Sequence, residues 1–386
     1  MSTESKRRKL WPWIVGGVVV LLVAGGLAAW RWMVGSYHRY YEESYAPVTL
    51  TVEHAGRFPD AFHLDDVPWI AASLPVCQST ALQMIAAQHG VEQPRPHFDF
   101  LMGFTYGATD MPGVGFFPIG TDPETGMLVA APYLGLAREY YVTDDGALYL
   151  EVLRTLISEG AAVRVPLDMA TLYGWAGKLP HNEVLVGYDA GGFYYYETVC
   201  LELAPCEPGM RPPGDRGLYV ADETLLNAVR GQARQFSYGW RYALTVFVPG
   251  PAETALAPVW AQNAEATTGG TYYGKRTGAV AVEELADKVT KQGARFDASK
   301  AAPGLKLAAT FRRDNAAYLR EQFPGQPDIA RVADLFCRAA DAYQAALEAA
   351  EDGIADEDEA TEVAAWLRNA AAAEREAGDV MRQRAQ

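Results

Sequence analysis

One cysteine of the chain stands where a helix is predicted to begin. Cys77 comes shortly after Pro75 and directly precedes QSTALQMIAAQHG, in which apolar residues recur at helical spacing until Gly90 ends the pattern. Backbone N–H groups at a helix start lack intrahelical acceptors, and together with the helix dipole they stabilise a thiolate, the reactive form of cysteine. Cys77 is therefore a candidate catalytic nucleophile, and the alternative is a buried, inert thiol.

A predicted β-hairpin carries the groups that would activate this thiol. HNEVLVGYDAGGFYYYETV, residues 181–199, has two β-rich runs around a Gly-Gly turn, with His181 at its start and Glu197 near its end. A three-residue loop at 190–192 would put Leu185 opposite Glu197, and His181 on the same sheet face. A two-residue loop would put them on opposite faces, because a one-residue slip turns every side chain over. In the first register Glu197 would orient the His181 imidazole as general base.

The segments around these residues mix helical and strand patterns. EVLRTLISEG (151–160) and ADETLLNAVRGQ (221–232) are predicted helices, while AAVRVPLD (161–168) and YGWRYALTVFVP (238–249) are predicted strands. Several segments from VAVEELADKVTKQG onward show an apolar stripe near the helical period. We expect an α+β domain followed by a helical domain of three or four helices.

These segments resemble a known family. VCQSTALQMIAAQHG, EGAAVRVPLD and HNEVLVGYDAGGFYYYETV resemble papain-like cysteine enzymes of the bacteriocin-processing peptidase type, and more closely the N-terminal domain of the butirosin biosynthesis protein H family. FRRDNAAYLREQF and DLFCRAADAYQAALEAA are similar to the helical domain that follows in that family. The resemblance covers residues 65–350 and implies a papain-like fold.

The resemblance also implies a Cys–His–Asp triad that transfers acyl groups through a cysteinyl thioester. Cys77 would be the nucleophile and His181 the base, with Glu197 in the place of the aspartate. Papain-like peptidases carry a glutamine six residues before the cysteine, where this chain has Ala71. The oxyanion hole would then use backbone N–H groups of Cys77 and Gln78, or the side chain of Gln78.

The beginning of the chain has the pattern of a membrane anchor. Lys6–Lys9 form a basic cluster ahead of an uncharged, apolar run from Trp11 to Trp30. A helix of about 20 residues spans about 30 Å, the hydrocarbon thickness of a bilayer. The basic cluster would hold the N-terminus in the cytoplasm. We expect an uncleaved helix in the lipid bilayer, the alternative being a cleaved signal peptide.

The predicted organisation follows from these boundaries. It comprises a basic cytoplasmic segment 1–10, a transmembrane helix 11–33, a juxtamembrane stalk 34–60, a papain-like domain 61–249, a linker 250–275 and a helical domain 276–386. The linker is placed where Ala, Thr, Gly and Pro accumulate without periodicity. Everything after the transmembrane helix would lie outside the cytoplasm.

The composition and the residue spacing limit which partners and cofactors are expected. A net charge of −15 and a pI of about 4.9 leave no basic groove for phosphates, which argues against nucleic acid. Cys200 and Cys206 are close enough in sequence for a local disulfide in an exported segment. Cys337 lies in an apolar helical stretch and is predicted to be a small buried hydrophobe. No ligand spacing indicates a metal, and no cofactor is expected.

The predicted function is cysteine-dependent cleavage or transfer at an amide or thioester carbonyl, outside the cytoplasm. The substrate would be a peptide or an acyl compound. The main alternative is a non-catalytic papain-like module that binds a peptide or a component of the cell envelope. Acyl transfer onto a small acceptor is a third interpretation, which requires an exported acyl donor.

Overall fold

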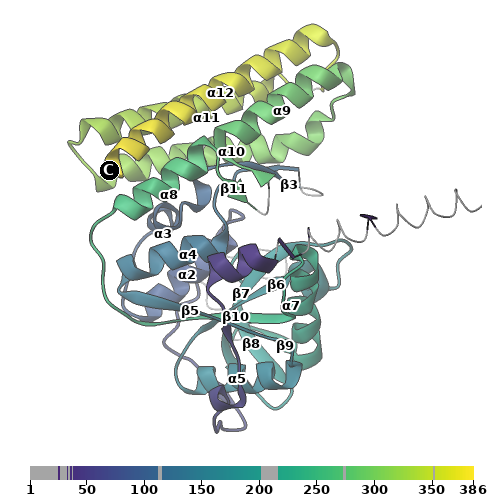
Figure 1. The fold of residues 1–386 in the computed structure, drawn as a ribbon, viewed down its shortest axis with the longest axis vertical. Coiled ribbons are helices and arrows are strands. Elements are labelled where there is room, and N and C mark those ends of the chain that lie inside the picture. The colour runs from purple at the N-terminus through teal and green to yellow at the C-terminus, as the bar shows by residue number, and fades with distance from the viewer. Residues whose placement is uncertain are drawn as a thin grey trace, which may run out of the picture.

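The structure, a computed structural model, describes residues 38–111, 115–200, 216–272, 275–350 and 353–386, together with Gly25, Gly26, Met33, Gly35 and Ser36. A mixed β-sheet with helices packed on it forms one part of the molecule. Long helices from the C-terminal part of the chain lie together at one end of it (Figure 1). The prediction of an α+β fold with a C-terminal helical region is confirmed.

An eight-stranded sheet organises the α+β part. Its strand order is β1 (Val48–Thr49), β5 (Leu136–Thr143), β10 (Tyr242–Pro249), β6 (Val163–Asp168), β7 (Pro180–Tyr188), β8 (Gly192–Tyr196) and β9 (Leu218–Ala221), and β2 (Phe62–His63) also pairs with β7. β1 runs parallel to β5, and the other pairs are antiparallel. β7 therefore lies in the interior of the sheet, between β6 and β8.

Helices bury the central strands. α2 (Cys77–Gln88) and α5 (Gly146–Ser158) pack on β7, and α7 (Asp222–Phe236) packs on β6. Every residue of β6 is buried, as is every residue of β7 after Pro180. Polar side chains in these strands therefore lie inside the protein, where each needs a partner to offset its lost hydration.

Shorter elements complete the described structure. They are α3 (Arg95–Met102), α4 (Pro123–Ala130), α6 (Met169–Tyr173), a hairpin of β3 (Thr109–Met111) and β4 (Gly115–Phe117), the pair β11 (Thr271–Tyr272) and β12 (Lys275–Arg276), and 3-10 turns at Val52–His54, Phe104–Tyr106, Ala131–Leu134 and Gly293–Arg295. The predicted helices 151–160 and 221–232 correspond to α5 and α7. The predicted strands 161–168 and 238–249 correspond to β6 and β10.

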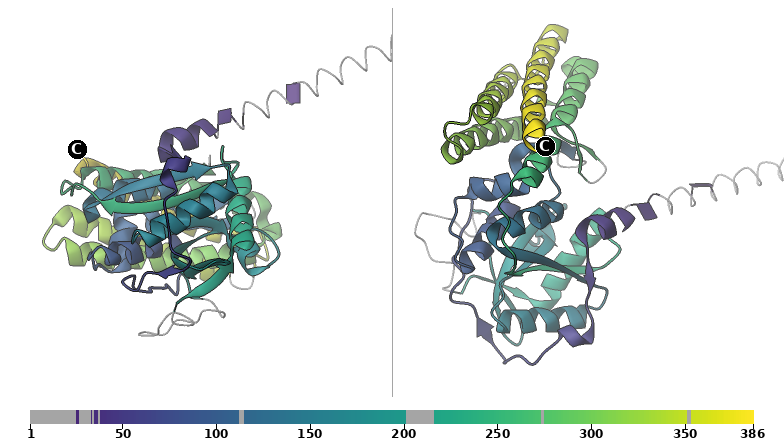
Figure 2. Two further views of the ribbon diagram at one scale, coloured as in Figure 1. Left: turned by 90° about the horizontal axis from the view of Figure 1, so that it is seen from below. Right: turned by 60° about the vertical axis from the view of Figure 1, so that its left-hand side comes forward.

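The helical region consists of α8 (Ala257–Thr268), α9 (Gly278–Gln292), α10 (Ala298–Gln322), α11 (Pro327–Glu348) and α12 (Glu357–Arg384). α12 packs against α8, α9 and α11, and α10 packs against α11 (Figure 2). The acidic run at the start of α12 is a helix cap, because the Asp356 carboxylate accepts from the backbone N–H groups of Asp358 and Glu359. Amphipathic periodicity alone was enough to predict the four longer helices.

The segment 250–275, predicted as a linker, instead contains α8 and belongs to the hydrophobic core. The buried ring of Trp260 lies 4.8 Å from that of Phe100 and 5.4 Å from that of Phe323, centroid to centroid. The sequence did not predict this helix because its alanine and threonine residues show no apolar periodicity. Much of its buried surface comes from a single residue, Trp260, which no periodic pattern reveals. One hydrophobic cluster consequently extends from the sheet into the long helices, and a second lies among the long helices themselves.

The predicted stalk 34–60 also packs on the sheet where the structure describes it. Residues 38–45 are helical, and Tyr41 and Tyr45 are buried. The Tyr41 ring lies 4.6 Å from that of Tyr238, and the Tyr45 ring lies 5.5 Å from that of Tyr140. The run of tyrosines therefore forms a packing surface rather than a solvated spacer, because tyrosine rings bury large apolar areas.

Among the residues that the structure describes, no helix is both long and apolar enough to cross a membrane. The long helices α10, α11 and α12 carry exposed charges such as Arg313, Arg331 and Glu376. This finding corrects the prediction of a single-pass membrane protein held in the bilayer with its domains outside the cytoplasm. The predicted basic segment 1–10 and most of the predicted span 11–33 lie outside the described residues.

Candidate active site

Cys77 is the first residue of α2 and carries a free thiol. The helix ends at Gln88, and Gly90 just beyond it has a φ of 79°, the left-handed conformation expected of a residue that follows a helix end. Leu82 and Ile85 are buried and fix the helix against the core. The thiol itself is partly exposed and lines a cavity. The candidate nucleophile is therefore at the helix start and within reach of a ligand.

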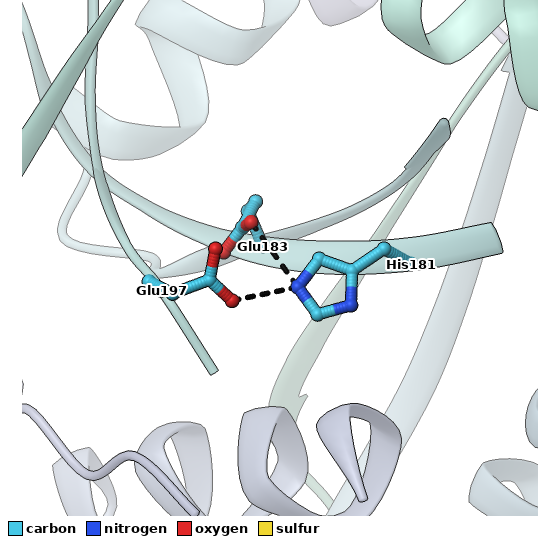
Figure 3. A group of neighbouring side chains, drawn as sticks. All are labelled: His181, Glu183 and Glu197. Carbon is cyan, nitrogen blue, oxygen red and sulfur yellow. Dashed lines mark hydrogen bonds and ion pairs between the residues drawn. The ribbon is translucent and has the colours of Figure 1, made fainter. Parts of the chain in front are cut away.

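His181 on β7 and Glu197 just after β8 meet on one face of the sheet (Figure 3). Nε2 of His181 lies 2.7 Å from Oε1 of Glu197, and both side chains are buried. The same Oε1 accepts from the backbone N–H of Val199 at 3.1 Å, and Tyr173 donates to Oε2 at 2.5 Å. Glu197 is thus held in place on both of its oxygens.

The turn alone would not have brought His181 and Glu197 together. Tyr188 pairs with Phe193 near the turn, and the backbone N–H of Asp189 donates to the carbonyl of Gly192 at 3.0 Å. If this register continued along the hairpin, His181 and Glu197 would lie on opposite faces, as in the two-residue loop considered from the sequence.

A β-bulge restores the shared face. Between Leu185 and Gly187 the pairing of β7 with β8 shifts by one residue, so that Leu185 pairs with Tyr195 rather than with Glu197 as predicted. Gly187 suits this position because β2 approaches closely: a Cβ there would lie 2.7 Å from the His63 ring. The predicted register is therefore wrong, although the predicted neighbours do meet.

A third ionisable residue, Glu183, joins the pair and was not predicted. It follows His181 by two residues on β7, so the two side chains share a face (Figure 3). Oε1 of Glu183 lies 3.3 Å from Nε2 of His181, but neither carboxyl oxygen has an aligned hydrogen-bond partner among the described residues. Side chains two residues apart on a strand share a face, so the spacing of His181 and Glu183 in the sequence could have identified Glu183 as a member of the site.

Burial and close charges set the protonation of these three residues. Burial and the charge of Glu197 raise the pKa of Glu183 well above its usual range, so its carboxyl is neutral. Burial alone would also raise the pKa of Glu197, but the charge of His181 and its hydrogen bond lower it to about 2. Burial opposes the His181 cation, yet Glu183, Cys77 and Glu197 raise its pKa well above the ordinary value. The site therefore holds an imidazolium, one carboxylate and one neutral carboxyl.

Cys77 takes part in the same electrostatic unit. An interaction with the Cys77 side chain contributes to the raised pKa of His181, and the two residues line the same cavity. Nε2 is already engaged by Glu197, with Oγ1 of Thr198 a further 3.4 Å neighbour. Nδ1 is consequently the ring nitrogen that is left for the sulfur.

Gln78, the candidate oxyanion donor, is oriented by a buried arginine. Its Oε1 lies 3.2 Å from Nε and 2.5 Å from Nη2 of Arg164. A guanidinium can only donate, so the atom facing it must be the amide oxygen, and the NH₂ group points away from it. Arg164 is balanced by Glu124, whose Oε1 lies 2.5 Å from Nη1. Since Gln78 lines the cavity, its NH₂ group is the end available to a bound oxygen.

The cavity beside Cys77 has a volume of about 380 Å³. Among the described residues that line it, every side chain is apolar except those of Ser73, Cys77, Gln78, His181 and Cys200. No carboxylate, lysine or arginine is among these lining residues. The chemistry-bearing groups therefore occupy one wall of an otherwise hydrophobic cavity.

The three ionisable residues suit proton sharing better than metal binding. Ligand atoms of His181, Glu183 and Glu197 lie within 4.8 Å of one another, which a metal ion could in principle bridge. However, the 2.7 Å between Nε2 and Oε1 of Glu197 is a charge-assisted hydrogen-bond distance. Metal binding would also require a neutral imidazole and two ionised glutamates, against the raised pKa values of His181 and Glu183.

The remaining cysteines fall into two classes. Cys200 is disulfide-bonded, while Cys77 and Cys337 are free. Cys206, the predicted partner of Cys200, lies outside the described residues. Cys337 on α11 is only partly buried, and its sulfur lies 3.5 Å from Nη1 of Arg320. Cys337 therefore packs against the hydrophobic core as predicted, but it is only partly buried.

Comparison with known proteins adds no assignment to this geometry. No protein-family model matches the chain, and no curated protein matches it. The function must therefore be argued from the thiol, the imidazolium and the carboxylate around the cavity.

Proposed function

We propose that this chain is a papain-like cysteine enzyme that cleaves or transfers an acyl group at an amide or thioester carbonyl. The observation that carries the proposal is that Cys77, at a helix start, and His181, held by Glu197, line the same cavity. A helix that begins with the nucleophile and packs on an antiparallel sheet bearing base and acid supports the papain-like fold. The sequence resemblance to the butirosin biosynthesis protein H family supports the same arrangement.

In the first chemical step, Cys77 attacks the substrate carbonyl as a thiolate whose proton resides on His181. A bond forms between the sulfur and the carbonyl carbon, and the carbonyl oxygen becomes an oxyanion. The Gln78 NH₂ group and backbone N–H groups at the start of α2 donate to it. Collapse then breaks the bond to the leaving nitrogen or sulfur, which takes the proton from His181, and the acyl group remains on Cys77 as a thioester.

In the second step, a nucleophile releases the acyl group. Neutral His181 accepts a proton from water or from an acceptor amine, thiol or alcohol as that molecule attacks the thioester. The bond between carbon and sulfur breaks, which restores the thiolate and the imidazolium. Water gives hydrolysis, and any other acceptor gives transfer. Glu197 stays ionised throughout, fixing the ring orientation and stabilising its positive charge.

Alkylation with iodoacetamide at pH 7 tests the proposal. The variant Cys337→Ala removes the other free thiol among the described residues, so that labelling in this background reports on Cys77. We expect rapid labelling in this background, slowed about a hundredfold by the additional change His181→Ala, because the ring both takes the proton and balances the thiolate charge. Mass spectrometry of the labelled peptide gives the rates.

The matched control retains Cys337 and carries Cys77→Ala. The side chain that contacts the Cys337 sulfur is the Arg320 guanidinium and not His181, so the labelling of Cys337 should not respond to His181→Ala. Slow labelling of Cys77 that is indifferent to His181→Ala would contradict catalysis. It would favour the alternative, a non-catalytic module that binds a peptide or a cell-envelope component in the same cavity.

A further inference from the structure

We infer that the cavity beside Cys77 holds an uncharged, apolar acyl group, so that the substrates of this site are acyl compounds with a hydrocarbon-like acyl part. This inference rests on the proposed function, because it assumes that the acyl carbonyl is presented to the Cys77 sulfur. It goes further by naming the chemical class that the site selects. Two sources share this chemistry, a fatty acyl chain and the acyl half of a peptide that ends in an apolar residue.

The lining of the cavity carries the first argument. Its walls include Leu74, Phe104, Phe117, Ile119, Met169 and Val199. A charged or strongly polar acyl group would lose its hydration against these side chains and find no compensating partner. A hydrocarbon group would instead release water from the cavity wall on binding. Of the few polar side chains in the wall, those of Cys77, Gln78 and His181 are needed for the carbonyl, and Ser73 and Cys200 carry no charge.

The exposed side chains at the cavity carry the second argument. Trp175 and Leu179, which follow α6, both line the cavity, yet they are 45% and 41% exposed. Large apolar side chains left in solvent beside a hydrophobic cavity are typical of a surface that a ligand covers. Trp366 on α12 and Leu128 on α4 are 37% and 40% exposed and do not line this cavity. They supply matched residues for the test.

The size of the cavity limits the acyl group. Its volume of about 380 Å³ is more than twice that of an apolar cavity of about 150 Å³ that accepts a benzene molecule. An acyl chain of medium length fits this space, as does an apolar amino-acid side chain with its neighbouring peptide unit. A two-carbon acetyl group would leave most of the wall uncovered.

Hydrolysis of p-nitrophenyl esters tests this selectivity. Cys77 forms a bond to the acyl carbon, p-nitrophenolate leaves, and water then hydrolyses the thioester; Cys77→Ala protein gives the blank rate. We expect kcat/KM for the octanoate to exceed that for the acetate by at least about tenfold, because each buried methylene adds favourable transfer free energy. The butanoate should exceed the hemisuccinate, which has the same chain length but a charged end.

Two peptide-like esters distinguish the sources. If the p-nitrophenyl esters of N-acetyl-leucine and N-acetyl-phenylalanine surpass the octanoate, the natural acyl part is peptide-like, and the reverse order indicates a fatty acyl chain. Either order supports an apolar acyl site. Equal rates for octanoate, acetate and hemisuccinate would overturn the inference while leaving the cysteine mechanism intact.

Matched variants locate the selectivity in the cavity. Leu179→Lys and Trp175→Ala should reduce the octanoate-to-acetate ratio at least about threefold, since they remove apolar surface that the chain would cover. Leu128→Lys and Trp366→Ala change equally exposed side chains elsewhere and should leave the ratio unchanged. An equal loss in all four variants would overturn the assignment to this cavity.

A binding measurement separates failure of the inference from failure of the proposed function. Calorimetry with octanamide and Cys77→Ala protein reports on the cavity without any chemistry. Binding that Leu179→Lys weakens, in a protein whose unmodified form hydrolyses none of the esters, would overturn the cysteine mechanism and support the apolar site. No binding of octanamide at millimolar concentration would overturn the apolar site, whatever the ester assays show.

Discussion

Two buried clusters of ionisable side chains, one in the helical region and one on the sheet, differ in composition and surroundings. Arg312 of α10 and Glu374 of α12 are both fully buried, and their side chains lie 2.7 Å apart. Tyr343 donates to the same carboxylate oxygen at 2.8 Å. On the sheet, the imidazole of His181 faces two carboxyl groups, one at 2.7 Å and one at 3.3 Å. The first cluster has one cation for one anion, and the second has a surplus carboxyl.

The balanced Arg312–Glu374 pair holds two helices together, whereas the His181 cluster has the groups to take part in chemistry. The Arg312–Glu374 pair is balanced and enclosed, so its contribution is to the stability and register of α10 and α12. The His181 cluster opens onto a cavity with a free thiol, and the Glu197 carboxylate, 2.7 Å from Nε2, favours the protonated imidazole. Buried charge alone therefore does not mark a candidate active site; the adjacent free thiol and the cavity do.

The largest expected effect concerns the proposed nucleophile, Cys77, which lies beside only one of the two clusters. Cys77→Ala should reduce the hydrolysis of p-nitrophenyl octanoate by at least about a thousandfold, since the covalent route is lost. The circular dichroism spectrum should not change, because alanine is small and fits a helix start. Cys337→Ala is the control and should keep full activity. Substantial enzymatic activity in Cys77→Ala protein would remove the proposed distinction.

Breaking the balanced cluster should affect stability rather than chemistry. Arg312→Met leaves the buried Glu374 carboxylate without its cation, and we expect a loss of about 3–5 kcal/mol in the free energy of unfolding. Urea titration measures it. The double variant with Glu374→Met should recover most of the loss, while thiol labelling of Cys77 stays unchanged in both proteins. An unchanged free energy of unfolding in Arg312→Met would show that the Arg312–Glu374 pair does not stabilise the fold.

Removing the carboxylate of the sheet cluster should weaken catalysis less than removing the thiol. We expect Glu197→Gln to lower kcat/KM about a hundredfold, because the acid orients and stabilises His181 without reacting itself. Loss of the Glu197 charge should also lower the pKa of His181, so the imidazole loses its proton at a lower pH. The alkaline limb of the pH–rate profile should therefore move to lower pH. Glu139→Gln on β5, outside the cluster, is the control.

The smallest expected effect concerns the surplus carboxyl. Folded Glu183 keeps a proton that the unfolded chain releases above about pH 4.3, so wild-type stability should fall as pH rises through this range. Glu183→Gln removes this contribution. Between pH 5 and pH 6 the variant should lose about 1 kcal/mol less stability than the wild type.

Urea titrations at the two pH values provide this measurement. Burial raises the pKa values of Asp99 and Asp122 to about 6, but both residues are present in both proteins, so their contribution cancels. If the free energy of unfolding changed equally between pH 5 and pH 6 in the wild type and in Glu183→Gln, Glu183 would be ionised in the folded protein. The sheet cluster would then carry one more negative charge than the pKa shifts indicate, whereas the Arg312–Glu374 cluster has one cation for one anion.

Local patterns in the sequence were sufficient where local interactions decide the structure. The start of α2 at Cys77, its end before Gly90 and the amphipathic helices α9 to α12 follow from backbone hydrogen bonding and side-chain periodicity. The same reasoning failed for residues 250–275, because the burial of Trp260 depends on Phe100 and Phe323, which are distant in sequence.

The sequence by itself determined which residue types could act and on which elements they lie: a thiol at a helix start, an imidazole on a strand and a carboxylate after the returning strand. Tertiary structure decided whether they meet. A one-residue bulge beside Gly187, which β2 approaches closely, places His181 and Glu197 on the same face. Burial then determined their charges, since removal of water keeps Glu183 protonated while the His181 charge keeps Glu197 ionised. Register and desolvation depend on contacts between segments far apart in the chain, which no local pattern encodes.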